Sequence, residues 1–116
     1  ATFDFLAPTG GVPPRAVPID RSRVLALFYN NRAVELLMGG DTGQAYWWAR
    51  ASVLQDPAYA GGFITLGALW HQFGRHEQAQ LAYEAALLRD PRNTNAAANL
   101  AGLVTSAPGV SPRPAE

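Results

Sequence analysis

Apolar residues recur three or four positions apart along most of the chain, which is the spacing that places them on one face of an α-helix. Breaks that contain glycine, proline or aspartate divide this pattern into five segments. The first segment has a capping residue at Asp20 or Ser22 and the last at Asn93 or Thr94, because these side chains can accept hydrogen bonds from a first helical turn. We therefore expect an all-α protein with helices over about residues 22–38, 42–55, 58–73, 75–89 and 94–104.

The breaks between these helices are of two alternating kinds. Residues 39–41 read Gly-Gly-Asp and residue 74 is again a glycine, which reverses the chain after a helix by adopting a left-handed conformation. Residues 56–57 and 90–91 both read Asp-Pro, and a residue that precedes proline avoids the helical region. Glycine turns thus join two helices into a pair, and Asp-Pro breaks separate one pair from the next.

The third and fourth helices share a motif of aromatic and small residues with fixed spacing. Its members are Phe63, Leu66, Gly67, Trp70, Ala79, Tyr83 and Pro91. A shift of 34 positions toward the N-terminus places Phe63, Gly74, Ala79, Asp90 and Pro91 on Tyr29, Gly40, Ala45, Asp56 and Pro57. This spacing and this period resemble the tetratricopeptide repeat (TPR) family. The resemblance implies an α-solenoid of antiparallel helix pairs, and the chain is similar to the TPR segment of a larger bacterial protein.

The resemblance also divides the chain. A TPR domain is expected over residues 20–105, with repeats at about 26–59 and 60–93 and a capping helix at about 94–104. Each helix pair needs a neighbour to bury its apolar face, which gives the capping helix a structural purpose. Residues 106–116 contain three prolines and are expected to form a flexible tail.

Residues 1–19 are expected to form an extended arm, because four prolines remove amide donors and disfavour helix there. The arm begins with the apolar side chains of Phe3, Phe5 and Leu6. One interpretation is that they pack on the first helix or belong to a linker. The other is that the arm occupies a groove, either its own or that of a second copy.

Small residues are expected where the helices of a pair cross closely, with Gly67 or Ala33 against Ala79 or Ala45. A larger side chain at such a crossing costs about 1–3 kcal/mol through overpacking. The aromatic residues Tyr29, Phe63, Trp70 and Tyr83 are expected to fill the spaces between successive helices and, because each buries a large area, to contribute most to core stability.

The first repeat departs from the motif, since Arg32 stands in the place of Leu66 and two tryptophans follow. We expect Trp48 to replace lost packing volume and Trp47 to lie exposed on the convex side.

Composition narrows the classes of function. The 116 residues include nine acidic and nine basic residues, all of the latter arginines, so the formal charge of zero gives no attraction to nucleic acid or to anionic membranes. The absence of cysteine excludes disulfides and thiolate chemistry and leaves the compartment open between bacterial cytoplasm and periplasm. No apolar run approaches the roughly 20 residues of a membrane span, and we expect a soluble protein.

In the TPR family the first helix of each pair lines a concave groove that binds extended peptides. The resemblance carries this role to twelve positions, which are Leu27, Asn30, Asn31, Val34, Met38, Ile64, Thr65, Ala68, His71, Gln72, Asn95 and Asn99. Asn31 and Asn99 occupy equivalent positions, and an asparagine amide can donate to and accept from a peptide backbone at once. These positions hold no Lys or Arg, which disfavours the clamp for a C-terminal carboxylate that one TPR subclass uses.

No motif of an enzyme is present, and we expect no catalytic residue, metal or cofactor. His71 and His76 are five positions apart, whereas a helical metal pair prefers a spacing of four. Three interpretations stay open. In the first, the chain is a protein-interaction module that presents a groove to a peptide or partner domain. In the second, it is a non-catalytic scaffolding or oligomerising segment of a larger bacterial enzyme, with the arm or capping helix exchanged between copies. A third reading makes the short array a structural spacer without a groove ligand.

Overall fold

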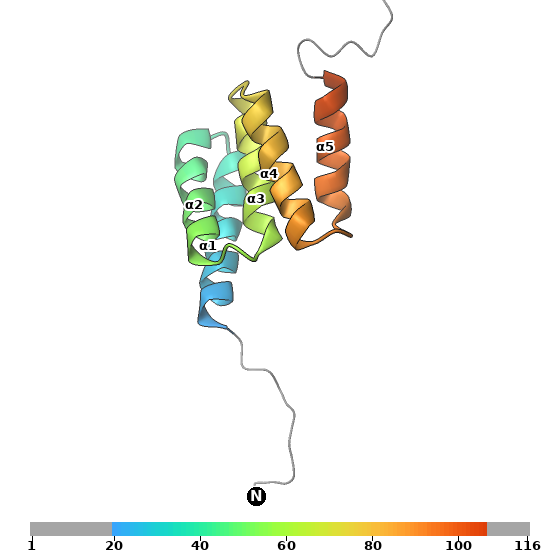
Figure 1. The fold of residues 1–116 in the computed structure, drawn as a ribbon. Helices are drawn as coiled ribbons and strands as arrows, with labels where there is room; N and C mark the ends of the chain where they lie inside the picture. The colour runs from blue at the N-terminus through green and yellow to red at the C-terminus, as the bar shows by residue number, and fades with distance from the viewer. Residues whose placement is uncertain (1–19, 107–116) are drawn as a thin grey trace, which may run out of the picture.

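The computed structural model describes residues 20–106, so the predicted arm and all but the first residue of the predicted tail lie outside the described part. Within it the chain is all-helical, as predicted (Figure 1). Its five helices are α1 (Arg21–Met38), α2 (Thr42–Gln55), α3 (Ala60–Gln72), α4 (His76–Arg89) and α5 (Thr94–Ser106).

The helix ends follow from local hydrogen bonds. Asp20, rather than Ser22, caps α1, because its carboxylate accepts from the Ser22 amide at 2.9 Å. Asn93, rather than Thr94, caps α5, because its Oδ1 accepts from the amide of Ala96 at 2.9 Å. The predicted start of α3 at residue 58 is two residues early, since Ala58 still belongs to the turn that follows Asp-Pro. Helix α5 runs two residues beyond its predicted end, to Ser106.

Glycine makes the turn within each pair, as predicted. Gly40 has φ 90° and Gly74 has φ 79°, which is the left-handed region that other residues rarely adopt. The Asp-Pro breaks are alike as well, since the amides of Asp56 and Asp90 donate to the carbonyls of Ser52 and Ala86, four residues earlier.

The helices form two layers (Figure 1). Helices α1 and α3 are in contact, as are α3 and α5, so these three form one layer. Helices α2 and α4 pack on that layer but do not contact one another. A two-layer array curves toward the layer whose members lie closer together, so we call the α1, α3, α5 side the inner layer and α2 and α4 the outer layer.

The core is built largely of alanine, which lets the helices approach closely. In the first pair Ala33 meets Ala45 in a cluster with Ala49 and Leu69, and all four side chains are fully buried. This confirms the expected crossing of the first pair. The second pair differs from the expectation, because the nearest atoms to Gly67 belong to the ring of Tyr83 rather than to Ala79.

The departures of the first repeat are explained by packing around α2. The Trp48 ring lies 6.4 Å from that of Phe28 and 5.6 Å from that of Tyr29, centroid to centroid, and packs on the first core cluster. Trp47 is 60% exposed, as expected for an outward position. Ser52 is fully buried and donates to the carbonyl of Ala26 at 2.8 Å, which ties α2 to α1.

Candidate functional site

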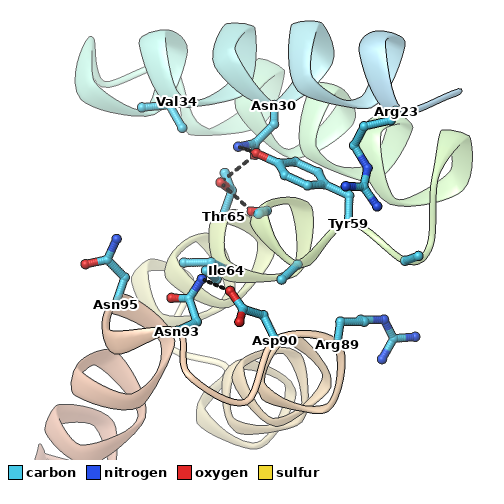
Figure 2. Close-up of a pocket in the computed structure, with 13 residues that line it drawn as sticks. Arg23, Asn30, Val34, Tyr59, Ile64, Thr65, Arg89, Asp90, Asn93 and Asn95 are labelled. Carbon is cyan, nitrogen blue, oxygen red and sulfur yellow. Dashed lines mark hydrogen bonds between the residues drawn. The ribbon is translucent and has the colours of Figure 1, made fainter. Parts of the chain in front are cut away.

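A cleft of about 630 Å³ opens on the inner layer (Figure 2). Its walls come from α1, from the loop between α2 and α3 with the start of α3, and from the loop between α4 and α5 with the start of α5. The lining residues are Arg23, Asn30, Val34, Ala58, Tyr59, Ala60, Gly61, Ile64, Thr65, Arg89, Asp90, Asn93 and Asn95.

Five of the twelve predicted groove residues line this cleft: Asn30, Val34, Ile64, Thr65 and Asn95. The other seven are outside its lining: Leu27, Asn31, Met38, Ala68, His71, Gln72 and Asn99. The cleft lies where α3 and α5 begin, whereas the predicted positions also extend toward the ends of α1 and α3. The cleft and the predicted groove therefore overlap on the same layer without coinciding.

The back of the cleft is a hydrogen-bonded contact between α1 and α3. Asn30 is buried, its Oδ1 accepts from the Thr65 hydroxyl at 2.6 Å, and its Nδ2 lies 3.5 Å from the Tyr59 hydroxyl (Figure 2). The Thr65 oxygen is also 3.2 Å from the carbonyl of Gly61. The polar atoms of Asn30 and Thr65 are thus satisfied within the protein, so these side chains position the helices and are poor candidates for binding a ligand.

The Tyr59 ring rests directly on Gly61. A Cβ atom at Gly61 would lie 2.3 Å from both Cζ and the hydroxyl oxygen of Tyr59, which no real contact permits. Glycine at this position therefore lets the ring lie across the start of α3, where its hydroxyl meets Asn30.

Two arginines outside the predicted groove positions lie at the cleft, whereas the predicted positions themselves hold no Lys or Arg. The Arg23 Nε donates to Asp56 at 2.5 Å, and its guanidinium lies 5.4 Å from the centre of the Tyr59 ring. The Arg89 Nε donates to the carbonyl of Pro57 at 2.6 Å, and its guanidinium lies 4.3 Å from the centre of the Phe63 ring. Both are therefore anchored to the same loop.

The bond from Arg23 lowers the pKa of Asp56 below its usual 3.8. The amide of Ala58 donates to the same carboxylate at 3.0 Å and acts in the same direction, while burial opposes both. Asp56 is thus held as the anion that fixes Arg23, and the Nη atoms of Arg23 have no hydrogen bond within residues 20–106.

Two asparagines line the wall of the cleft that lies across from α1, and only one of them has hydrogen-bond partners within the protein. Both polar atoms of the Asn93 side chain have partners within the protein, since its Oδ1 caps α5 and its Nδ2 donates to Asp90 at 3.1 Å (Figure 2). Asn95 is exposed, and its side-chain amide has no hydrogen-bond partner in the described part of the chain. Val34 on α1 and Ile64 on α3 are half-buried and add apolar side chains to the lining of the cleft.

Arg23, Tyr59, Arg89 and Asn93 were absent from the predicted site. The predicted positions all lie on the first helix of each pair or on the capping helix, whereas Tyr59 and Asn93 lie in loops and Arg89 ends α4. Arg23 contacts Asp56, which is 33 positions away in the sequence, and Tyr59 contacts Asn30 at a distance of 29 positions, so no local pattern indicates these contacts.

Across residues 20–106, no group of three or more His, Cys, Asp or Glu side chains is placed to hold a metal ion. The rings of His71 and His76 lie 5.2 Å apart outside the cleft. None of the described helices is long and apolar enough to cross a membrane.

The chain belongs, by its fold, to the class of all-helical arrays of antiparallel pairs. No family model matches its sequence, and no curated protein matches it either.

Proposed function

We propose that this protein is an interaction module of the TPR type and that its cleft binds an extended peptide of a partner protein. The family assignment is supported by the 34-position correspondence between the pairs, which recurs in equivalent glycine turns and Asp-Pro breaks. The cleft is supported as the binding site by its place on the inner layer, where TPR proteins bind peptides.

The observation that carries the proposal is the chemistry of the cleft walls. An extended peptide offers backbone donors and acceptors along both edges and side chains on alternate faces. The unpartnered amide of Asn95 can both donate and accept, and the Nη groups of Arg23 can donate to peptide carbonyls. Val34 and Ile64 between them suit an apolar side chain. A volume of about 630 Å³ is that of a typical ligand site and holds a few peptide residues.

A longer peptide would continue along the inner layer past the cleft. Asn99 lies one helical turn beyond Asn95 on α5, and Asn31 is exposed on α1. We propose that these two amides add contacts only for such longer ligands, so that Asn95 contributes more than either.

The test is a selection from a displayed library of random linear peptides, followed by calorimetric titration of the best peptide. We expect Asn95→Ala to weaken binding about tenfold, in line with the loss of one or two hydrogen bonds, and Asn99→Ala to weaken it less. Gln44→Ala, which removes an exposed amide from α2, is the matched control and should leave binding unchanged. Failure to enrich any peptide, or equal effects of Asn95→Ala and Gln44→Ala, would contradict the proposal.

A further inference from the structure

The outer layer carries large apolar side chains that nothing in the described part of the chain covers. Trp47 and Leu54 on α2 are 60% and 67% exposed, and Leu81 and Leu88 on α4 are 64% and 80% exposed. Residues seven positions apart lie two turns apart on the same face of a helix, so each helix presents one outward row. The rows are also equivalent, since Leu81 and Leu88 follow Trp47 and Leu54 by 34 positions. Exposed apolar residues are ordinary when scattered, but a set that repeats on both helices of the outer layer indicates an interface.

The two rows differ in charge. Arg50 lies between the apolar residues of α2, with its guanidinium 5.5 Å from the centre of the Trp47 ring. Glu84 lies at the equivalent position on α4, and Glu77 precedes Leu81 by one turn. Within residues 20–106, neither Arg50 nor Glu84 forms a salt bridge. The α2 row is thus apolar and basic, and the α4 row is apolar and acidic.

The same face also has a shallow apolar depression of about 280 Å³. Phe63, Leu66 and Trp70 of α3 line it, and Leu81 of α4 is part of its wall. The molecule therefore carries both a protruding ring, that of Trp47, and an apolar hollow beside the equivalent residue of the next pair.

We propose that the outer layer is a homodimer interface in which α2 of each copy packs against α4 of the other. With a twofold axis parallel to the helices, Trp47, Arg50 and Leu54 of one copy meet the equivalent Leu81, Glu84 and Leu88 of the second copy. The same contacts recur by symmetry, as an isologous interface requires. Trp47 of each copy enters the depression of the other.

Charge selects this arrangement over the alternatives. If α2 packed on α2 of the second copy, two Arg50 side chains would face each other. If α4 packed on α4, the carboxylates of Glu77 and Glu84 would gather in one place. Like charges brought together across an interface are strongly unfavourable, whereas α2 against α4 pairs opposite charges twice. Because the cleft lies on the inner layer, the dimer keeps two clefts open.

A charge swap tests the proposal with the full 116-residue chain. Sedimentation equilibrium over a range of concentrations should show a reversible dimer. Arg50→Glu or Glu84→Arg alone should raise its dissociation constant at least about tenfold, because each places like charges at both symmetric contacts. The double variant Arg50→Glu/Glu84→Arg should restore dimerisation. Both changed positions are exposed, and circular dichroism will verify the fold of all three variants.

Arg92→Glu changes the same charge in the exposed loop before α5 and should leave the dimer intact. A chain that stays monomeric at every concentration would overturn the proposal. So would a dimer that the single charge reversals leave unchanged, or a double variant that fails to recover. No peptide enters this experiment, so its outcome is independent of the outcome for the cleft.

Discussion

Replacement of Gly67 by alanine places one methyl group against the ring of Tyr83. A Cβ atom at Gly67 would lie 2.4, 2.6 and 2.8 Å from ring atoms Cε1, Cδ1 and Cζ of Tyr83. Carbon atoms in favourable contact are about 3.5–4.0 Å apart, so the helix or the ring must move by about 1 Å. Tyr83 is only 2% exposed and shares a core cluster with Ala79 and Leu103, so the ring has no open space to enter.

The expected change in stability is the balance of two terms. Overpacking of a rigid core costs about 1–3 kcal/mol. Alanine in place of glycine inside a helix raises the free energy of unfolding by about 1 kcal/mol, because alanine has the higher helix propensity. We therefore expect Gly67→Ala to lower the free energy of unfolding by about 1 kcal/mol, and Gly67→Leu to lower it further. For a domain of this size, 1 kcal/mol corresponds to a decrease in Tm of roughly 4–8 °C.

The assay is urea unfolding followed by circular dichroism, with Gly102→Ala as the matched control. Gly102 is also inside a helix, but a Cβ atom there meets nothing within 4 Å. Gly102→Ala should therefore stabilise the protein by about 1 kcal/mol, opposite in sign to Gly67→Ala. In a Tyr83→Leu background the penalty of Gly67→Ala should shrink. If Gly67→Ala stabilises the protein as much as Gly102→Ala does, the close approach to Tyr83 is refuted.

Three further predictions concern single polar groups. Because the pKa of Asp56 is lowered in the fold by Arg23, the carboxylate stabilises the protein above the unfolded value near 3.8, and this contribution is lost as the pH falls through the folded pKa. The Tm advantage of the wild type over Asp56→Asn should shrink on acidification below pH 3.8, and a constant difference would contradict this. Ser52→Ala should lower the free energy of unfolding by about 0.5–1.5 kcal/mol in urea titrations, because it removes the buried bond to Ala26, and a neutral effect would refute that role. Burial raises the pKa of Tyr83 above 10.0, so thermal scans should show stability falling above that pH in the wild type and falling less in Tyr83→Phe.

Much of the fold could be predicted from local sequence, because its helix boundaries are made by local interactions. A glycine that must adopt positive φ and an aspartate before proline end a helix whatever packs around it, and Gly40, Gly74, Asp56 and Asp90 do so here. The choice between Asp20 and Ser22 as a cap was open in the sequence, since either oxygen can reach a first-turn amide. The structure shows that Asp20 has the extended backbone conformation of a capping residue, whereas Ser22 is already helical.

The cleft was predicted less well because its residues are brought together by packing between helices. Helical periodicity separates Asn30 and Asn31 by about 100° around α1 but does not say which of them faces α3. In the structure Asn30 is buried against Thr65 and Asn31 is exposed. That difference depends on how α1 is rotated against α3. Arg23 is held by Asp56 and Arg89 by Pro57, each pair more than 30 positions apart, and such pairs leave no periodic signal.

The partner of Gly67 was mistaken for a related reason. A small residue in each helix suggests that the two meet at a crossing, and Ala33 with Ala45 does so. In the second pair the ring of Tyr83 reaches across from the next turn of α4 and fills the space above Gly67. The size of a residue therefore indicated that a close approach exists, but not which side chain makes it.

We propose that the cleft on the inner layer binds an extended peptide, and nuclear magnetic resonance can locate that peptide. The most direct measurement is a set of intermolecular nuclear Overhauser effects between the isotope-labelled protein and an unlabelled peptide from the library selection. We expect contacts from peptide protons to the methyl groups of Val34 and Ile64 and to the side-chain amide of Asn95. Contacts confined to Trp47, Leu81 and their neighbours on the outer layer would contradict it.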